Sequence, residues 1–530
     1  MSAAKTPGPL AIKIFRALWI AGLVSNVGSF MHGVGASWLL TSLSTSPAIV
    51  ALLQTATSLP SFLLALPAGA LADVFDRRRL LLCTQIAMAL IAAGLAIATF
   101  ADVVTATWLL VFSVLLSIAG TLNMPNWVAL TPELVPRDQL ASASALNAVS
   151  MNIAQAIGPA VGGIVIAAAG AEWVFALNAI SFAGVIVVIE QWRRPTRDTR
   201  LPPEHVVSAM RTGLRYVGNE RNIQVVLVRV AVVMTFSSAL AALMPVIARS
   251  RVGATAGQFG LLSGALGAGA VTAALIIPRL RGRFGPDGIV AAGTALLAGA
   301  TIAVGHVTTV GPLALLLFVG GFGQLLAFTS IFAIAQAVLP AWVRGRGLAV
   351  AMLVVQGVTA GMAVIWGSLA GSRGIPLTMT VAGVGLLIAS VVVAPLRLRG
   401  RAEIDLTPIT WGELHTALHL HDDQGPVLIS VSWVVEPDDV PAFSAAMRVV
   451  RRQRRRDGAI TWGLFEDVDQ PGHLTESFIV ASWAEHERQH DRPTVADQLA
   501  QEPARRFLLD GHTPHVRHHI GRHNVETRRH

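Results

Sequence analysis

GALADVFDRRRLL, at residues 69–81, closes a long apolar run that begins near residue 48 and places charged side chains directly behind it. A helix of about 20 apolar residues spans the roughly 30 Å hydrocarbon core of a bilayer. The aspartates and arginines of the stretch then lie at the membrane surface. The stretch therefore predicts a charged turn between two membrane-spanning helices.

The composition extends this prediction to most of the chain. Of 530 residues, 53% are hydrophobic and only 13% are charged, which a water-soluble globule of ordinary surface does not accommodate. Because lipid offers no partner to unpaired backbone groups, each long apolar run is expected to be helical. The sequence predicts an all-α membrane protein with twelve spans, at about residues 17–41, 48–72, 80–100, 106–130, 144–168, 172–191, 222–248, 257–279, 288–306, 311–339, 347–370 and 375–396.

The placement of the arginines predicts the orientation of the chain. The net charge is +9, and arginines gather after every second apolar run, at residues 77–79, 137, 193–221, 279–283, 344–346 and 397–399. Because positive loops stay in the cytoplasm, both termini are expected there. Residues 1–16 lack the features of a cleaved secretory signal, so the first run is expected to remain as a helix. This distribution favours a membrane protein over a nucleic-acid-binding one.

The chain divides into two halves and a tail. We expect a six-helix half at 1–191, a cytoplasmic central loop at 192–221, a second six-helix half at 222–400, a linker at 401–425, a soluble domain at 426–520 and a basic tail at 521–530. Arg279-Leu-Arg-Gly-Arg-Phe-Gly285 is a degenerate repeat of the opening motif in the matching loop of the second half. Two repeated halves imply a substrate site between them, near the middle of the membrane.

The opening motif resembles the loop sequence G-x-L-x-D-R-x-G-R-K of the major facilitator superfamily of transporters. Gly69, Asp73, Arg77 and Arg78 fit it, whereas Asp76 stands where the motif has its second glycine. The resemblance implies a conformational switch, in which Asp73 meets the start of the eleventh span when the cytoplasmic side is shut. The alternative is that these charges only solvate a loop and fix the topology.

The fifth span carries a second element of the same superfamily. Gly158, Pro159, Gly162 and Gly163 resemble the G-P-x-x-G-G element of exporters. Small residues let helices approach closely, and proline permits a bend. Ordinary helix packing is the alternative explanation.

Three further segments, at residues 132–137, 336–346 and 405–408, narrow the resemblance. With them the chain, from about Phe15 to His519, resembles the transmembrane secretion effector group, which includes enterobactin exporters. The resemblance implies a bacterial cytoplasmic-membrane exporter of small molecules such as siderophores or drugs.

Polar residues within the spans are candidates for contact with substrate or protons. They are Ser29, His32, Gln54, Asn123, Asn147, Asn152, Gln155, Gln324 and Gln356. Each could instead bond a neighbouring helix, as polar membrane residues commonly do. His32 is the best titratable candidate for proton coupling, because the spans hold almost no carboxylates away from their ends. The absence of a G-x-x-x-x-G-K-[ST] sequence argues against an ATP-driven pump.

Residues 426–520 predict a soluble α+β domain of order βαββαβ, which is ferredoxin-like. It resembles small antibiotic biosynthesis monooxygenases, but fold likeness does not carry activity. We expect a binding, regulatory or dimerisation module with no catalytic residue and no cofactor. A membrane-tethered enzyme or sensor, acting through this domain, is the alternative function for the whole chain.

His486-Glu487-Arg488-Gln489-His490 matches the zinc-protease motif H-E-x-x-H. Pro493 follows closely and cuts the helix short, so the sequence favours a chance match and predicts no metal. Six arginines between residues 448 and 456 lie on one predicted helix, where they either face solvent or dock on anionic lipid.

Overall fold

The computed structural model describes residues 8–192, 206–398, 405–409 and 424–521. It divides into two compact units. The first combines Met1–Val206, Leu227–Phe332 and Ala351–Arg397, and the second combines Val207–Val226, Ala333–Val350 and Leu398–His530. Most of the expected linker at 401–425 and all but the first residue of the expected tail at 521–530 lie outside the described residues.

The helical part consists of twelve helices long and apolar enough to cross a membrane, within the described ranges. This confirms the predicted all-α membrane architecture. The helices are α1 (Lys13–Leu43), α2 (Pro47–Val74), α3 (Arg77–Phe100), α4 (Ala106–Leu134), α5 (Leu140–Ala169), α6 (Ala171–Gln191), α8 (Arg221–Val246), α9 (Ala256–Arg281), α10 (Pro286–Val304), α11 (Val310–Val338), α12 (Arg344–Arg373) and α13 (Ile375–Val393).

Local sequence fixes where several of these helices begin. The Asp76 side chain accepts from the Arg79 amide and caps α3, and Thr105 caps α4 in the same way. Thr255 and Gln258 form a reciprocal capping box at the start of α9. Gly170 joins α5 to α6 at φ 104°, a backbone conformation that glycine adopts without steric cost.

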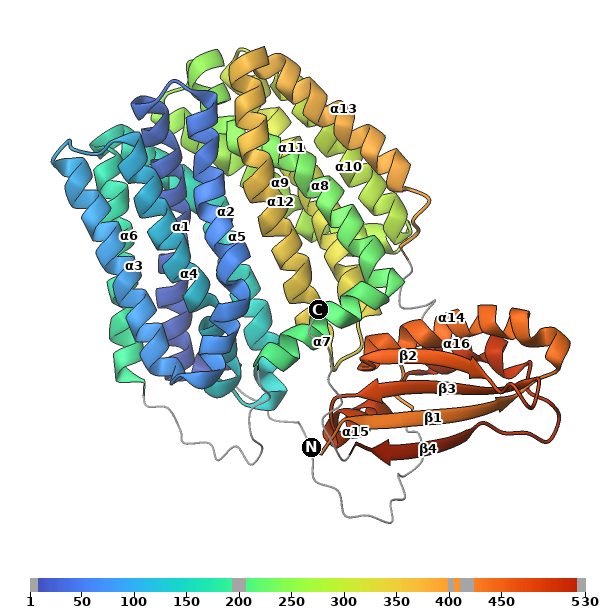
Figure 1. The fold of residues 1–530 in the computed structure, drawn as a ribbon. Coiled ribbons are helices and arrows are strands. Elements are labelled where there is room, and N and C mark those ends of the chain that lie inside the picture. Colours follow the sequence, from blue (N-terminus) through green and yellow to red (C-terminus); the bar gives the residue numbers. More distant parts are fainter. Residues whose placement is uncertain (1–7, 193–205, 399–404, 410–423, 522–530) are drawn as a thin grey trace, which may run out of the picture. The chain divides into compact units, whose positions relative to one another are not determined.

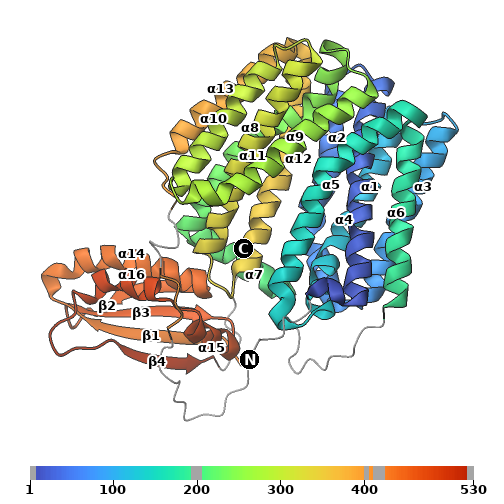
Figure 2. The same ribbon diagram turned by 180° about the vertical axis from the view of Figure 1, so that it is seen from behind.

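The helices gather in two groups, α1 to α6 and α8 to α13 (Figures 1 and 2). In the first group, α1 packs on α5 and α6, and α3 packs on α6. In the second group, α10 packs on α13. The groups are joined where α5 crosses α9 and where α2 packs on α12.

The soluble domain contains one antiparallel sheet of order β2-β3-β1-β4. Its strands are β1 (Val427–Val434), β2 (Thr461–Glu466), β3 (His473–Val480) and β4 (His515–Ile520). With α14 (Val440–Asp457) and α16 (Val495–Arg505), the sheet confirms the predicted ferredoxin-like βαββαβ order. A short additional helix, α15 (Trp483–Asp491), lies between β3 and α16 and ends before Pro493.

Alternation along β1 builds the core of this domain. Val427, Ile429, Val431 and Trp433 are buried, whereas the residues between them are more exposed. Phe443 of α14 packs against Trp433, with ring centroids 5.5 Å apart. The period of two thus turns one face of the sheet toward α14.

An unpredicted helix, α7 (Val206–Asn219), lies in the central stretch between the two halves. Its buried face consists of Thr212, Gly213, Tyr216 and Val217. They recur four residues apart, which is the spacing of one helix face. The polar composition of the surrounding stretch conceals this pattern in the sequence.

Candidate transport site and its loop motif

A cavity of ≈ 450 Å³ lies in the first unit, and both six-helix halves contribute to its wall. Helices α1, α2, α4 and α5 line it from the first half, and α8 and α9 line it from the second. No residue of this wall carries a carboxylate or a guanidinium group. The cavity therefore offers apolar surface with a few neutral polar groups, as expected of a site for a small organic molecule.

Three of the predicted polar candidates line this cavity: Ser29, His32 and Gln54. The His32 ring packs on Phe175, with centroids 4.8 Å apart. Its Nδ1 is buried and has no hydrogen-bond partner among the described residues. Gln54 donates to the Ser58 hydroxyl at 3.1 Å. His32 thus brings an unsatisfied polar atom to the cavity region.

The other candidates lie elsewhere in the bundle. Asn123 accepts hydrogen bonds from Thr84 at 3.0 Å and Gln85 at 3.4 Å, which joins α4 to α3. Asn147 donates to Thr131 and borders a separate cavity of ≈ 50 Å³. Asn152 is exposed, Gln155, Gln324 and Gln356 are half-buried, and none of these four lines either cavity.

Several hydroxyl groups of the wall were not predicted. They belong to Ser37, Thr57, Ser113, Ser117 and Ser263. Ser113 donates to the Leu109 carbonyl one turn earlier, and Ser117 donates across to the Thr57 carbonyl at 2.6 Å. The spacing of Ser113 and Ser117, one turn apart, places both on one face of α4 and could have indicated them.

The glycines of the helix 5 element are contact points for two other helices. A Cβ atom at Gly158 would lie 2.6 Å from the Phe30 Cβ, and one at Gly162 would lie 3.0 Å from the Met31 Cα, both on α1. A Cβ atom at Gly163 would lie 2.5 Å from the Gly260 Cα on α9. Pro159 lines the large cavity. This element therefore holds α5 against α1 and against the second half at the same time.

Further contacts between the halves lie toward the same end of the bundle, where α1 ends and α2 begins. Arg249 donates to Thr41 at 3.2 Å and to Ser42 at 2.9 Å, and its guanidinium lies 5.0 Å from the Trp38 ring centroid. Thr55 donates to the Ala360 carbonyl at 2.7 Å, which joins α2 to α12. The halves are thus closely joined at this end.

The loop motif lies at the opposite end of α2. Arg77 forms an ion pair with Glu133 at 2.8 Å, and Arg78 donates to the carbonyls of Ile189 and Glu190. These bonds tie the start of α3 to the ends of α4 and α6. The Gly69 backbone is unobstructed, since a Cβ atom there would meet nothing within 4 Å. The Asp73 side chain lies outside the described part of the structure.

The second half has a related anchor at its own last helix. Arg229 of α8 donates to the carbonyls of Ala394 and Leu396, just beyond α13. It also forms an ion pair with Asp287, in the first turn of α10, at 2.9 Å. Each half thus uses an arginine to bind the carbonyls that end its sixth span.

Comparison with known proteins agrees with this architecture. A family model described as "Transmembrane secretion effector" matches residues 4–526. The chain belongs to the transmembrane secretion effector family.

This secretion effector is 27% identical over 337 residues to the enterobactin exporter EntS of Salmonella choleraesuis, which covers 63% of the chain and 80% of that relative. It is 26% identical over 225 residues to the multidrug efflux pump Tap of Mycobacterium bovis, covering 40% of the chain and 52% of that pump. These matches confirm the predicted family, and the chain is a multi-pass membrane transporter of small molecules.

Solved structures support the same fold. A bacterial homolog of the human lysosomal transporter Spinster, in an inward-facing and unoccupied conformation, matches with a TM-score of 0.60 at 14% identity. The match covers 74% of the secretion effector and 98% of the Spinster homolog. At this identity the likeness concerns the fold alone, which is that of a major facilitator transporter.

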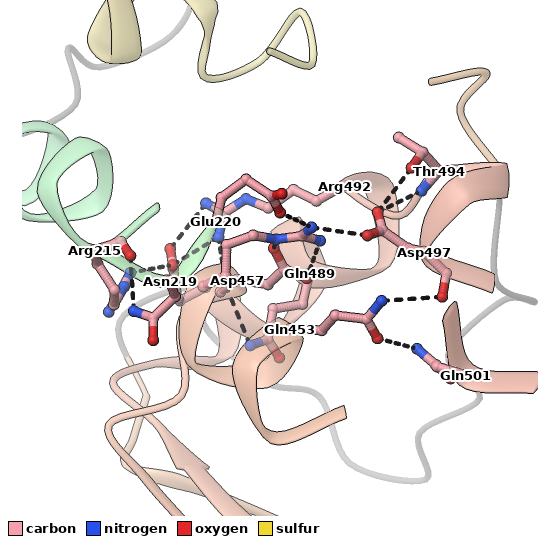
Figure 3. A network of polar contacts seen from close by, with 12 residues as sticks. Arg215, Asn219, Glu220, Gln453, Asp457, Gln489, Arg492, Thr494, Asp497 and Gln501 are labelled. Carbon is pink, nitrogen blue, oxygen red and sulfur yellow. Dashed lines mark hydrogen bonds and ion pairs between the residues drawn. The ribbon is translucent and has the colours of Figure 1, made fainter. Parts of the chain in front are cut away.

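The second unit of the secretion effector contains a buried polar network (Figure 3). Arg456 of α14 bonds to Asp457, to Asp497 of α16 and to Glu220, which follows α7. Burial works against the charge of Arg456, but Asp457 and Asp497 outweigh it and hold the pKa well above its ordinary value. Arg456 therefore stays charged at any physiological pH.

Two further arginines, Arg215 and Arg492, bind one glutamate and join α7 to α15. Arg215 of α7 lies 3.3 Å from Glu485, and Arg492 lies 2.9 Å from the same carboxylate oxygen. Arg492 also lies over the ring of Trp342, in the connection between α11 and α12, at 4.5 Å. Tyr216 of α7 meets that ring edge-on at 5.5 Å. Within this unit, the soluble domain, α7 and the α11–α12 connection thus meet around shared side chains.

The α15 helix also carries His486, directly after Glu485 in the chain. Burial, together with the neighbouring His518 and His490, lowers the pKa of His486 to about 3. The ring is therefore neutral at physiological pH.

Proposed function

We propose that this secretion effector exports a small organic molecule, siderophore-like or drug-like, from the bacterial cytoplasm. The observation that carries the proposal is the ≈ 450 Å³ cavity with walls from both halves. Its apolar lining and neutral polar groups suit a neutral or weakly polar organic substrate. The activities named for the enterobactin exporter and the multidrug pump agree with such a cavity.

We further propose that transport proceeds by alternating access between two states. The contacts made by Arg249, Thr55 and Gly163 join the halves at one end of the bundle. In the predicted topology, with both termini in the cytoplasm, this end faces away from the cytoplasm. The arrangement is that of a transporter closed on its outer side, and rocking of the halves would open that side.

The loop motif supports a switch at the cytoplasmic end. Gly69, Asp73, Arg77 and Arg78 form this switch in the proposal. Arg77 and Arg78 hold the start of α3 to α4 and α6 within the first half. With these bonds, α3, α4 and α6 would move together as a rigid body. Asp73 would meet the start of α12 when the inner side shuts.

We propose the proton gradient as the energy source and His32 as the residue that exchanges a proton. The cavity wall has no carboxylate, and His32 Nδ1 is unsatisfied among the described residues. His32 is the one residue of this wall with a side chain that can take up and release a proton.

The test is accumulation of a panel of dyes, drugs and siderophores in cells with and without the protein, before and after collapse of the proton gradient. We expect cells with the protein to accumulate less of a substrate than cells without it. After collapse of the proton gradient, both should accumulate the same amount. His32→Gln should abolish the dependence on the gradient, whereas His306→Gln should not, because His306 bonds Thr380 outside the cavity. No difference over the panel, with the protein present in the membrane, would contradict the proposal.

The soluble domain is proposed as a regulatory module. Its contacts with α7 and with Trp342 reach the connection that leads into α12, where the proposed switch partner lies. The rival is a tethered enzyme or a sensor. Deletion of residues 426–530 separates them, since an exporter should keep part of its flux and a tethered enzyme should lose its activity.

A further inference from the structure

Three histidines gather at one end of the sheet of the soluble domain. His486 and His490 lie one turn apart on α15, and His518 lies on β4. One ligand nitrogen from each lies within 4.8 Å of the other two. His518 is paired with Ile429 of β1, a buried residue, so its side chain lies on the same face of the sheet as the core.

Two of these rings carry buried nitrogens without a hydrogen bond. His486 is 3% exposed, and its Nε2 has no hydrogen-bond partner among the described residues. The same holds for the Nε2 of His518. A buried polar atom that loses its bonds to water is costly unless another partner replaces them. These two nitrogens therefore require a partner that the described side chains do not supply.

A neighbouring amide sets the tautomer of His486. Gln489 donates through Nε2 to the Asp457 carbonyl at 3.3 Å, which directs its Oε1 toward the His486 Nδ1 at 3.4 Å. Nδ1 is then the protonated nitrogen, and Nε2 keeps its lone pair. Metal-binding histidines are commonly oriented by such a bond from the second ring nitrogen.

Contacts between the tilted rings explain only part of this cluster. The rings of His486 and His518 lie 4.7 Å apart, and Trp483 lies 5.3 Å from His486. These contacts bury carbon surface, but they leave both Nε2 atoms unbonded. A cation bound between the rings would satisfy the nitrogens.

We propose that His486, His490 and His518 bind one divalent first-row transition metal ion, with zinc as the first choice. Imidazole nitrogen is a preferred ligand of zinc, copper, nickel and iron ions. Zinc–nitrogen bonds of about 2.0–2.1 Å place tetrahedral ligands roughly 3.4 Å apart. Small side-chain movements would bring the three histidine nitrogens, now within 4.8 Å of one another, to that separation. Three protein ligands leave the fourth position to water or to an added ligand.

The site differs from that of a zinc protease. In H-E-x-x-H enzymes the glutamate between the histidines activates water. Here Glu487 accepts a hydrogen bond from the Trp483 indole at 2.8 Å. The proposed function is metal binding, and peptide hydrolysis is not part of it.

The test uses the full-length protein, purified in detergent without a histidine tag and stripped with a chelator. We expect one zinc ion per chain on reconstitution, measured by mass spectrometry. Titration with Co²⁺ should give visible absorption bands of a tetrahedral site, and zinc should displace them. Substoichiometric zinc, or absence of these bands, would overturn the proposal.

Variants assign the ligands. His490→Gln and His518→Gln replace the two less buried rings and should each weaken binding at least 10-fold, with the secondary structure unchanged by circular dichroism. Gln489→Leu should weaken metal binding by about 10- to 100-fold, because it removes the hydrogen bond that fixes the tautomer of His486. His519→Gln, the matched control on the same strand, should bind as the parent does. Equal binding by the parent and both ligand variants would assign the metal to other histidines and refute the site.

Discussion

The two units of this secretion effector differ in where their buried charges lie. In the membrane bundle, the cavity wall has no charged side chain, and the buried Arg229 lies outside that wall, where it bonds the carbonyls beyond α13 and Asp287. In the second unit, Arg456 and Arg492 are buried and bond several partners each. Directional bonds hold one geometry, whereas apolar packing allows helices to shift. The comparison indicates a bundle suited to movement and a second unit suited to a fixed arrangement.

The largest effect is expected from Arg456→Met, which removes the shared cation of the second unit. Asp457, Asp497 and Glu220 would be left without it, and breaking a buried ion pair costs about 3–5 kcal/mol. Thermal unfolding of the domain should shift downward, and proteolysis near α7 should increase. Arg452→Met is the control, because Arg452 is an exposed residue of the same helix. Equal stability of the two variants would remove the distinction between the units.

A smaller effect is expected from Gly163→Val in the bundle. The new side chain would meet the Gly260 backbone, and overpacking costs about 1–3 kcal/mol. Because 1.4 kcal/mol is a factor of ten, export should fall about 5- to 150-fold while membrane insertion persists. Gly184→Val on α6 is the control, since a Cβ atom there meets nothing within 4 Å. Normal export by Gly163→Val would show that this crossing does not limit transport.

The smallest effect is expected from Arg249→Gln at the joined end of the bundle. The change removes a cation that lies over Trp38 and bonds Thr41 and Ser42, for a loss of about 1 kcal/mol. This end of the bundle should then open more often, by about 5-fold, as measured by labelling of a cysteine introduced beside the cavity. Arg373→Gln replaces an exposed arginine at the C-terminal end of α12 and should leave labelling unchanged. If both variants label alike, Arg249 does not hold this end closed.

The sequence predicted the bundle well because lipid imposes a simple rule on long apolar runs. The charged turn before α3 was also recognised, although Asp76 proved to be the N-cap of that helix. Helix α7 was missed because its buried positions are few and lie in an arginine-rich stretch. In this case composition outweighed periodicity.

The site was harder to predict, because spacing places residues on a common face without showing what that face meets. Ser29 and His32 face the cavity region, but Asn147 bonds Thr131 and Asn123 bonds α3. The network around Arg456 joins residues 220 and 497, which no local pattern relates. Long-range contacts of this kind come only from the folded chain.

The crossing of α5 and α9 at Gly163 and Gly260 has a mechanical consequence. The two backbones touch there without an intervening side chain, so no interlocked side chains oppose rotation of one helix against the other. In the proposed alternating-access cycle the helices would pivot at this crossing, and backbones in direct contact would permit this with little repacking. In that cycle these two glycines would serve as the pivot between the halves, next to the cavity that Pro159 lines.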